Sequence, residues 1–262
     1  MTENPPSPAS PPPVLSLRGL RKQFGTNVAV ENLWLDVPAG SMLGLLGPNG
    51  AGKTTTLAMA TGLLRPDAGA AIVLGADVWQ DPAAAKGRMG VLPDGVRMLD
   101  RLTGAELLRY CGLLRGMPEP DVASRSAELL EALGLADAGS TLVVDYSAGM
   151  RKKIALACAL IHAPRLLILD EPLEAVDPVS GETIRQILRA YVAGGGTVVM
   201  SSHVMELVES MCDRVAIVAE GRLLADGTLD EVRAGMTLQQ RFLQLVGAHE
   251  LGSETLAWLR SS

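Results

Sequence analysis

Aromatic side chains are scarce in this sequence: only 3% of its 262 residues are Phe, Trp or Tyr. A buried core must therefore be built from aliphatic residues and methionine. The hydrophobic share of 48% is enough for one large domain, or for one domain with an added lobe. Basic residues are also outnumbered by acidic ones: the sequence has 23 Lys and Arg and 29 Asp and Glu, so its formal net charge is -6. Proteins that bind nucleic acid regardless of its sequence are usually basic, so we expect no nucleic-acid partner.

Cysteine is rare and long apolar runs are missing. Three cysteines are an odd number and lie far apart in apolar stretches, which predicts reduced core residues of a cytosolic protein and no disulfide framework or metal site; they are Cys111, Cys158 and Cys212. The most apolar stretch, 154–169, is interrupted by a histidine, a proline and an arginine. It is shorter than the roughly 20 residues of a membrane-spanning helix, so we expect no span.

The first 13 residues, MTENPPSPASPPP, lack the basic start and apolar middle of a signal peptide. Their proline content is typical of a disordered or extended tail. We expect a tail at 1–13, a main domain at 14–236 and a C-terminal helical extension at 237–262.

Strand and helix patterns alternate through the middle of the chain. Apolar alternation and short apolar runs predict strands over 14–20, 28–37, 41–47, 70–75, 165–170, 196–202, 214–221 and 222–227. Helical spacing predicts helices over 52–64, 103–115, 121–133, 181–195, 228–234 and 237–246. The pattern predicts an α/β fold in which helices cover a mostly parallel sheet, with antiparallel strands at the beginning and end.

The stretch GPNGAGKT, residues 47–54, fits the P-loop pattern G-x-x-x-x-G-K-[ST] and lies between a predicted strand and a predicted helix. Glycines let backbone N–H groups surround an anion, and the helix start adds a positive dipole end. Lys53 can reach the β- and γ-phosphates, and the Thr54 hydroxyl can hold Mg²⁺. The phosphate-binding residues we expect are Gly47, Pro48, Asn49, Gly50, Ala51, Gly52, Lys53, Thr54 and Thr55.

A second motif, LLILDEP at 166–172, places Asp170 at the end of an apolar strand and Glu171 directly after it. A carboxylate there can meet Mg²⁺ at the P-loop, and the next one can orient a water molecule for attack on the γ-phosphate. The alternative is a strand that ends in acidic turn residues.

Two further stretches carry candidate residues. In YSAGMRKK, Ser147 and Gly149 precede a long helix whose basic residues oppose its dipole, which indicates a second anion site; the alternative is a capped helix with a solvated basic patch. His203 follows a predicted buried strand. It is either structural or a neutral imidazole that bonds a γ-phosphate oxygen and holds the attacking water.

In this order, the motifs resemble those of the nucleotide-binding subunits of ATP-binding cassette (ABC) transporters, over about residues 15–235. Phe24 matches the adenine-stacking aromatic of that family and His203 the switch histidine. The other matches are the Walker A motif at 47–55, the Q-loop at 92–95, the signature loop at 146–150, the Walker B motif at 166–171 and the D-loop at 176–178.

The resemblance implies a P-loop NTPase fold with an N-terminal antiparallel β subdomain and a helical signature subdomain at about 95–160. It implies ATP hydrolysis with Mg²⁺, in which Lys53, Glu171 and His203 are catalytic. Thr54, Asp170 and Asp94 would hold the metal.

The same resemblance implies a head-to-tail pair of subunits, most simply a homodimer. Ser147 and Gly149 would then act on the nucleotide of the partner. It further implies a separate membrane permease, to which the chain binds at the cytoplasmic face of the cell membrane. The signature variant Tyr-Ser-x-Gly-Met is most similar to bacterial exporter subunits.

Several residues depart from the family pattern. Asp94 replaces the Q-loop glutamine; it could reach Mg²⁺ through a water molecule, or it could cap a turn at Gly95. Ala148 replaces a signature glycine and would resist a positive φ, and Met150 replaces a glutamine. In PLEAVDP, Glu174 replaces a smaller residue and brings a charge to the dimer seam.

Two other functions compete with the transport ATPase. A DNA-maintenance ATPase of the same superfamily would insert a long coiled coil between the Walker motifs, and a translation factor would carry two cassettes; this chain shows neither pattern. A regulator that binds ATP without hydrolysing it would not need Lys53, Asp170, Glu171 and His203 all intact.

Overall fold

The structure, a computed structural model, describes residues 12–95 and 98–247. Its N-terminal part is an antiparallel sheet in the order β2-β1-β4-β5. On β2, buried Leu33 and Leu35 alternate with exposed Trp34 and Asp36, so that one face of this sheet packs on the core and the other meets solvent. The strands are β1 (Leu15–Phe24), β2 (Asn27–Val37), β4 (Ala68–Val73) and β5 (Ala76–Asp77).

A six-stranded sheet in the order β10-β9-β3-β8-β7-β6 forms the centre of the molecule. Its strands are parallel except β10, which pairs antiparallel with β9. The strands are β3 (Met42–Leu46), β6 (Met89–Leu92), β7 (Leu166–Leu169), β8 (Thr197–Ser202), β9 (Arg214–Ala219) and β10 (Arg222–Thr228). Because β3, β8 and β7 are parallel neighbours, the residues that follow them meet at one edge of the sheet.

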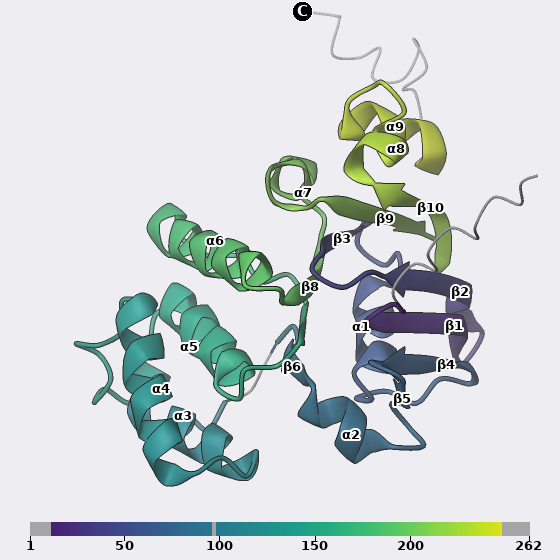
Figure 1. The fold of residues 1–262 in the computed structure, drawn as a ribbon. Coiled ribbons are helices and arrows are strands. Elements are labelled where there is room, and N and C mark those ends of the chain that lie inside the picture. The colour runs from purple at the N-terminus through teal and green to yellow at the C-terminus, as the bar shows by residue number, and fades with distance from the viewer. Residues whose placement is uncertain (1–11, 96–97, 248–262) are drawn as a thin grey trace, which may run out of the picture.

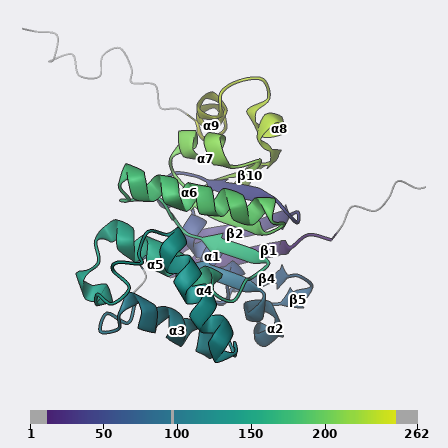
Figure 2. The same ribbon diagram turned by 60° about the vertical axis from the view of Figure 1, so that its left-hand side comes forward.

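Helices surround the two sheets. They are α1 (Lys53–Ala60), α2 (Pro82–Gly87), α3 (Gly104–Leu114), α4 (Glu119–Ala132), α5 (Ala148–Leu160), α6 (Pro178–Ala193), α7 (Met205–Met211), α8 (Leu229–Arg233) and α9 (Leu238–Val246), with a 3-10 turn at Val143–Asp145. Figures 1 and 2 show that α3, α4 and α5 gather into a lobe at the β6 side of the central sheet, away from β10. Helices α8 and α9 lie at the opposite side, beside β10 (Figure 1).

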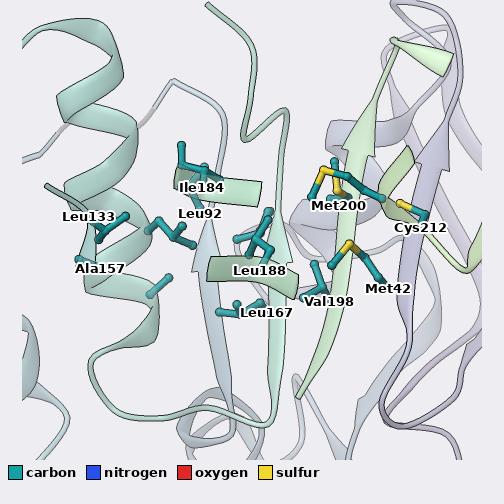
Figure 3. Packing of buried hydrophobic residues seen from close by; sticks show 14 of the residues in the cluster. Met42, Leu92, Leu133, Ala157, Leu167, Ile184, Leu188, Val198, Met200 and Cys212 are labelled. Carbon is teal, nitrogen blue, oxygen red and sulfur yellow. The ribbon is translucent and has the colours of Figure 1, made fainter. Parts of the chain in front are cut away.

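Two hydrophobic clusters hold these layers together. Along β3, Met42 and Leu46 face the cluster that reaches α5 and α6, whereas Leu43 and Leu45 face the cluster shared with the antiparallel sheet and α1. Figure 3 shows the first cluster, which includes Leu167 and Met200 from the sheet and Ile184 and Leu188 from α6. A strand buried on both faces reads as an unbroken apolar run, which is why the sequence of β3 carries no alternation.

The predicted fold class is confirmed, and each strand and helix predicted above has a counterpart within a few residues. Several short elements were missed, among them β5, α2, β6 and the 3-10 turn. The strand β6 contains Gly90, and a Cβ there would collide with the main-chain carbonyl of Ala159 on α5, so this glycine marks a close helix–strand contact.

The tail predicted at 1–13 and the extension predicted at 237–262 lie largely outside the described residues, and the domain limits stay predictions. Among the cysteines, Cys212 is buried while Cys111 and Cys158 are partly buried. Within the ranges 12–95 and 98–247, no helix combines the length and the apolar character needed to cross a bilayer.

Candidate functional site

The P-loop, residues 47–54, connects β3 to α1 at the carboxyl ends of the parallel strands of the central sheet. Gly52 has φ +99°, and a Cβ on it would lie 2.4 Å from the carbonyl oxygen of Ala29. A Cβ on Gly47 would lie 2.3 Å from the carbonyl oxygen of Val218. Side chains at these two positions would push the loop away from the strands below it. The two glycines therefore let the loop pass close to the main chain of these strands.

Helix α1 begins at Lys53, directly after the left-handed Gly52. The N–H groups of the first helical turn have no partner within a helix, and no described side chain caps this one. Together with the positive end of the helix dipole, they form a site whose donor set suits a phosphate group.

The Lys53 ammonium is held over this loop. Its side chain is 6% exposed, and Nζ donates to the carbonyl oxygens of Gly47 at 2.7 Å and Pro48 at 3.3 Å. Nζ also lies 3.6 Å from Oε1 of Glu171. A cation in this position can reach phosphate oxygens that rest on the N–H groups of the loop.

Asp170 and Glu171 follow β7, as the sequence predicts. Asp170 is buried, its N–H donates to the Leu92 carbonyl at 2.8 Å, and its Oδ1 accepts a hydrogen bond from the hydroxyl of Ser201. The same hydroxyl oxygen accepts the N–H of Glu171 at 2.9 Å. Ser201, on β8, therefore fixes both acidic residues, and sequence reasoning missed it although it stands two positions before His203.

His203 follows β8 and faces Glu171. Its Nδ1 lies 3.1 Å from Oε1 of Glu171. An ionised carboxylate only accepts, so the tautomer with its hydrogen on Nδ1 is the one that makes this hydrogen bond. The same carboxylate oxygen thus has Lys53 on one side and His203 on the other. Three motifs that are far apart in the sequence therefore converge on one carboxylate.

A cleft of about 510 Å³ opens over this cluster. Phe24, half exposed at the end of β1, stands at its border, and the Nζ of Lys22 lies 5.6 Å from the centre of its ring. The other residues that line the cleft are Asn27, Ala29, Pro48, Asn49, Gly50, Ala51, Gly52, Lys53, Thr54, Thr55, Asp94, Glu171, Glu174 and His203. An exposed aromatic beside a phosphate-binding loop can stack on a planar base.

Asp94 reaches the cleft from the loop after β6. One of its oxygens accepts the N–H of Gly95 at 2.8 Å, and Gly95 has φ +63°, so the turn-capping interpretation describes this contact. Asp94 also borders, with Thr54 and Asp170, a smaller hollow of about 50 Å³ beside α1. Hydroxyl and carboxylate oxygens are the donors that Mg²⁺ prefers, so these three residues fit the metal expected there.

Ser147 and Gly149 are not among the residues that line this cleft. Ser147 caps α5, with its hydroxyl accepting the N–H of Met150 at 3.2 Å. Gly149 packs against the start of α6, where a Cβ would lie 2.8 Å from the Asp177 carboxylate. Hydrogen bonds from Ser180 lower the pKa of that carboxyl, which therefore stays charged as the cap of α6. If these two residues touch a nucleotide, it is not one in this subunit's own cleft.

The basic residues after the signature loop make contacts within their own chain. Arg151 donates to the carbonyls of Tyr146 and Val144, Lys152 donates to that of Glu171, and Lys153 is buried. The second anion site and the solvated patch both stay predictions; in the subunit itself, Arg151 and Lys152 donate to main-chain oxygens. Ala148 is not strained either, because it is the first residue of α5 and is absent from the described residues with positive φ.

Comparison with known proteins points to one family. Residues 30–174 match the family model described as ABC transporter. The chain is 38% identical to the daunorubicin/doxorubicin resistance ATP-binding protein DrrA of Streptomyces peucetius, over 86% of this chain and 68% of that protein. It is 36% identical to the linearmycin resistance ATP-binding protein LnrL of Bacillus subtilis, over 82% of this chain and 69% of that one. A solved ATP-binding subunit of an ABC transporter has a TM-score of 0.83 at 29% identity, over 88% of this chain and 99% of the other.

Proposed function

This chain belongs to the ABC transporter family, and we propose that it is the ATP-hydrolysing subunit that drives a separate membrane permease in the direction of export. The observation that carries the proposal is the meeting of Lys53, Glu171 and His203 at the mouth of the P-loop. A further relative, 37% identical over 219 residues, is named as a Nod factor export ATP-binding protein, and that name supports export as the direction of transport.

Different residues of the cleft carry out different steps of ATP binding and hydrolysis. The N–H groups of the P-loop and the Lys53 ammonium bind the triphosphate, and Phe24 stacks on the adenine ring. Thr54 and Asp170 would hold Mg²⁺, with Asp94 beside them; when bound, the ion would neutralise charge that develops on the phosphate oxygens. Glu171 accepts a proton from water as the water oxygen attacks the γ-phosphorus, and ADP leaves with the bridging oxygen. His203 donates a hydrogen bond from Nδ1 to Glu171 and so orients the carboxylate.

A second subunit completes the site. We place Ser147 and Gly149 on the nucleotide of the partner, because both lie at the start of α5 and neither lines the cleft of its own chain. The open cleft of about 510 Å³ then closes between two copies of the chain when ATP is bound. Hydrolysis removes the γ-phosphate and lets the pair reopen.

The lobe formed by α3, α4 and α5 offers a surface for the permease. On α3, the apolar side chains of Tyr110, Leu113 and Leu114 are exposed by 47%, 39% and 72%. With Glu106 and Arg109 they line a hollow of about 490 Å³. Exposed apolar patches with a charged rim are typical of protein interfaces. We assign this one to a cytoplasmic segment of the permease, which would hold the chain at the inner face of the cell membrane.

A DNA-maintenance role has less support, because the described helices between the Walker motifs are at most 14 residues long, too short for an inserted coiled coil. The test of the transport role is to look for a reading frame beside this one that encodes a membrane protein, and to co-express the two chains. The proposal expects the two to co-purify and the permease to stimulate ATP hydrolysis. Hydrolysis that no membrane protein stimulates, together with binding to DNA or ribosomes, would contradict it.

A further inference from the structure

We propose that Lys152 is a positioning residue for Glu171: its ammonium holds the main chain of the catalytic glutamate and thereby links that glutamate to the signature helix. The observation is a hydrogen bond from Nζ of Lys152 to the carbonyl oxygen of Glu171 at 2.8 Å. The proposal rests on the role of Glu171 given above.

Glu171 needs such support because its backbone is strained. It has φ +45°, in the left-handed region that residues with a Cβ rarely adopt. Such a conformation persists only where the surroundings determine it, and it is common at catalytic sites. Rotation of this residue back to negative φ would swing the carboxylate away from Lys53 and His203.

Hydrogen bonds hold both sides of the strained residue. Its N–H donates to the hydroxyl of Ser201 at 2.9 Å, which anchors it to β8. Its carbonyl accepts from the N–H of Glu174 at 3.2 Å and from Lys152. The bond from Glu174 lies within the same turn and moves with it. Lys152 is therefore the group that ties the carbonyl to another element, α5.

The contact is important because Lys152 lies on α5, the helix that follows the signature loop. Ser147, which we place on the partner's nucleotide, caps the N-terminus of α5, and Lys152 lies about one turn after the first residue of this helix. Lys152 also lines a hollow of about 370 Å³ beside Asp94 and Glu174, both of which line the nucleotide cleft. A shift of α5 when the two subunits close would pass through Lys152 to the Glu171 carbonyl. The same helix would thus sense one ATP and position the catalytic glutamate of the other site.

The experiment compares steady-state ATP hydrolysis of the full-length chain with that of Lys152→Met, which keeps the aliphatic stem but removes the donor, and of Lys152→Arg, which restores a donor. Lys86→Met, an exposed lysine on α2, is the matched control. Loss of a charged hydrogen bond that fixes a catalytic group should lower kcat by about 10- to 100-fold. The affinity for ATP and the melting temperature should stay near those of Lys86→Met, and Lys152→Arg should recover most of the rate.

Two results would overturn the proposal: an unchanged kcat in Lys152→Met, or a fall of kcat, ATP affinity and melting temperature together that Lys152→Arg does not reverse. The second result would make Lys152 a packing residue. A parallel measurement on Glu171→Gln separates this failure from failure of the proposed function. If Glu171→Gln loses hydrolysis and Lys152→Met does not, only the role of Lys152 is wrong.

Discussion

His162 provides a test of the packing between the helical lobe and the sheet that does not involve nucleotide. It lies in the turn after α5, and its Nε2 donates to the carbonyl of Met89 at 3.0 Å. Its Nδ1 is buried and has no hydrogen-bond partner among the described residues. Protonation would place an N–H with no acceptor there, in a site that burial makes apolar and that Arg115 makes positive. These effects lower the pKa of His162 from its usual 6.5 to about 4.

The direction of the pH effect follows from proton binding. Between pH 6.5 and about 4 the unfolded chain carries a proton on His162 and the folded chain does not. The unfolded state is therefore favoured as the pH falls through this window, and the contribution of His162 to stability is complete only above pH 6.5. The gap in pKa corresponds to about 3.4 kcal/mol at most. Because the ring is partly exposed and screened by solvent, we expect about 1 kcal/mol between pH 7 and pH 5.

The assay is urea unfolding of the wild-type chain and of His162→Gln at pH 7 and pH 5. Glutamine can still donate an N–H to Met89 but cannot titrate in this range. The free energy of unfolding should fall between the two pH values by about 1 kcal/mol more in the wild type than in the variant. Equal losses in the two proteins would refute the reasoning. So would an NMR titration in which the His162 ring is protonated with a pKa above 6.

Two further predictions concern the nucleotide cleft. Lys53→Ala should abolish the rise in melting temperature that ATP-Mg²⁺ gives the wild type, because a ligand stabilises the state that binds it. A mixture of Lys53→Ala and Ser147→Ala subunits should regain part of the hydrolysis that each variant lacks, since a mixed pair contains one intact site. Asp94→Asn should leave ATP affinity nearly unchanged and reduce the Mg²⁺ concentration needed for hydrolysis, because it removes one negative charge from a cleft that already holds Asp170, Glu171 and the triphosphate.

Each of these predictions has a result that would contradict it. An unchanged shift in melting temperature for Lys53→Ala would disprove the phosphate-binding role of the loop, and no recovery in the mixture would disprove the shared site. For Asp94→Asn, Mg²⁺ curves that superimpose on those of the wild type would leave Asp94 as the cap of the Gly95 turn and no more.

The sequence predicts the main catalytic groups well because each lies at the end of a recognisable strand. Lys53, Asp170 and His203 follow β3, β7 and β8, and parallel neighbouring strands bring their carboxyl ends together whatever the length of chain between them. A motif read along the chain therefore translates into a position in space, and the cleft could be anticipated before its geometry was known.

Contacts that depend on packing could not be read from the sequence. The hydroxyl of Ser201 bridges Asp170 and Glu171 only because β7 and β8 pair in one particular register. The bond from Lys152 to Glu171 needs α5 to pack against the turn after β7. From the sequence, a basic residue after a signature loop predicts a bound anion as readily as a main-chain contact, because the neighbouring residues do not show whether its acceptor is a phosphate or a carbonyl oxygen.

The most direct test of the account is the rate of ATP hydrolysis of Glu171→Gln. The substitution keeps the size of the side chain between Lys53 and His203 but removes the base that accepts the proton of the attacking water. Glu131→Gln, an exposed residue on α4, is the control. The account predicts that Glu171→Gln binds ATP-Mg²⁺ as the wild type does and hydrolyses it about 10²- to 10⁴-fold more slowly. Hydrolysis near the rate of Glu131→Gln would contradict it.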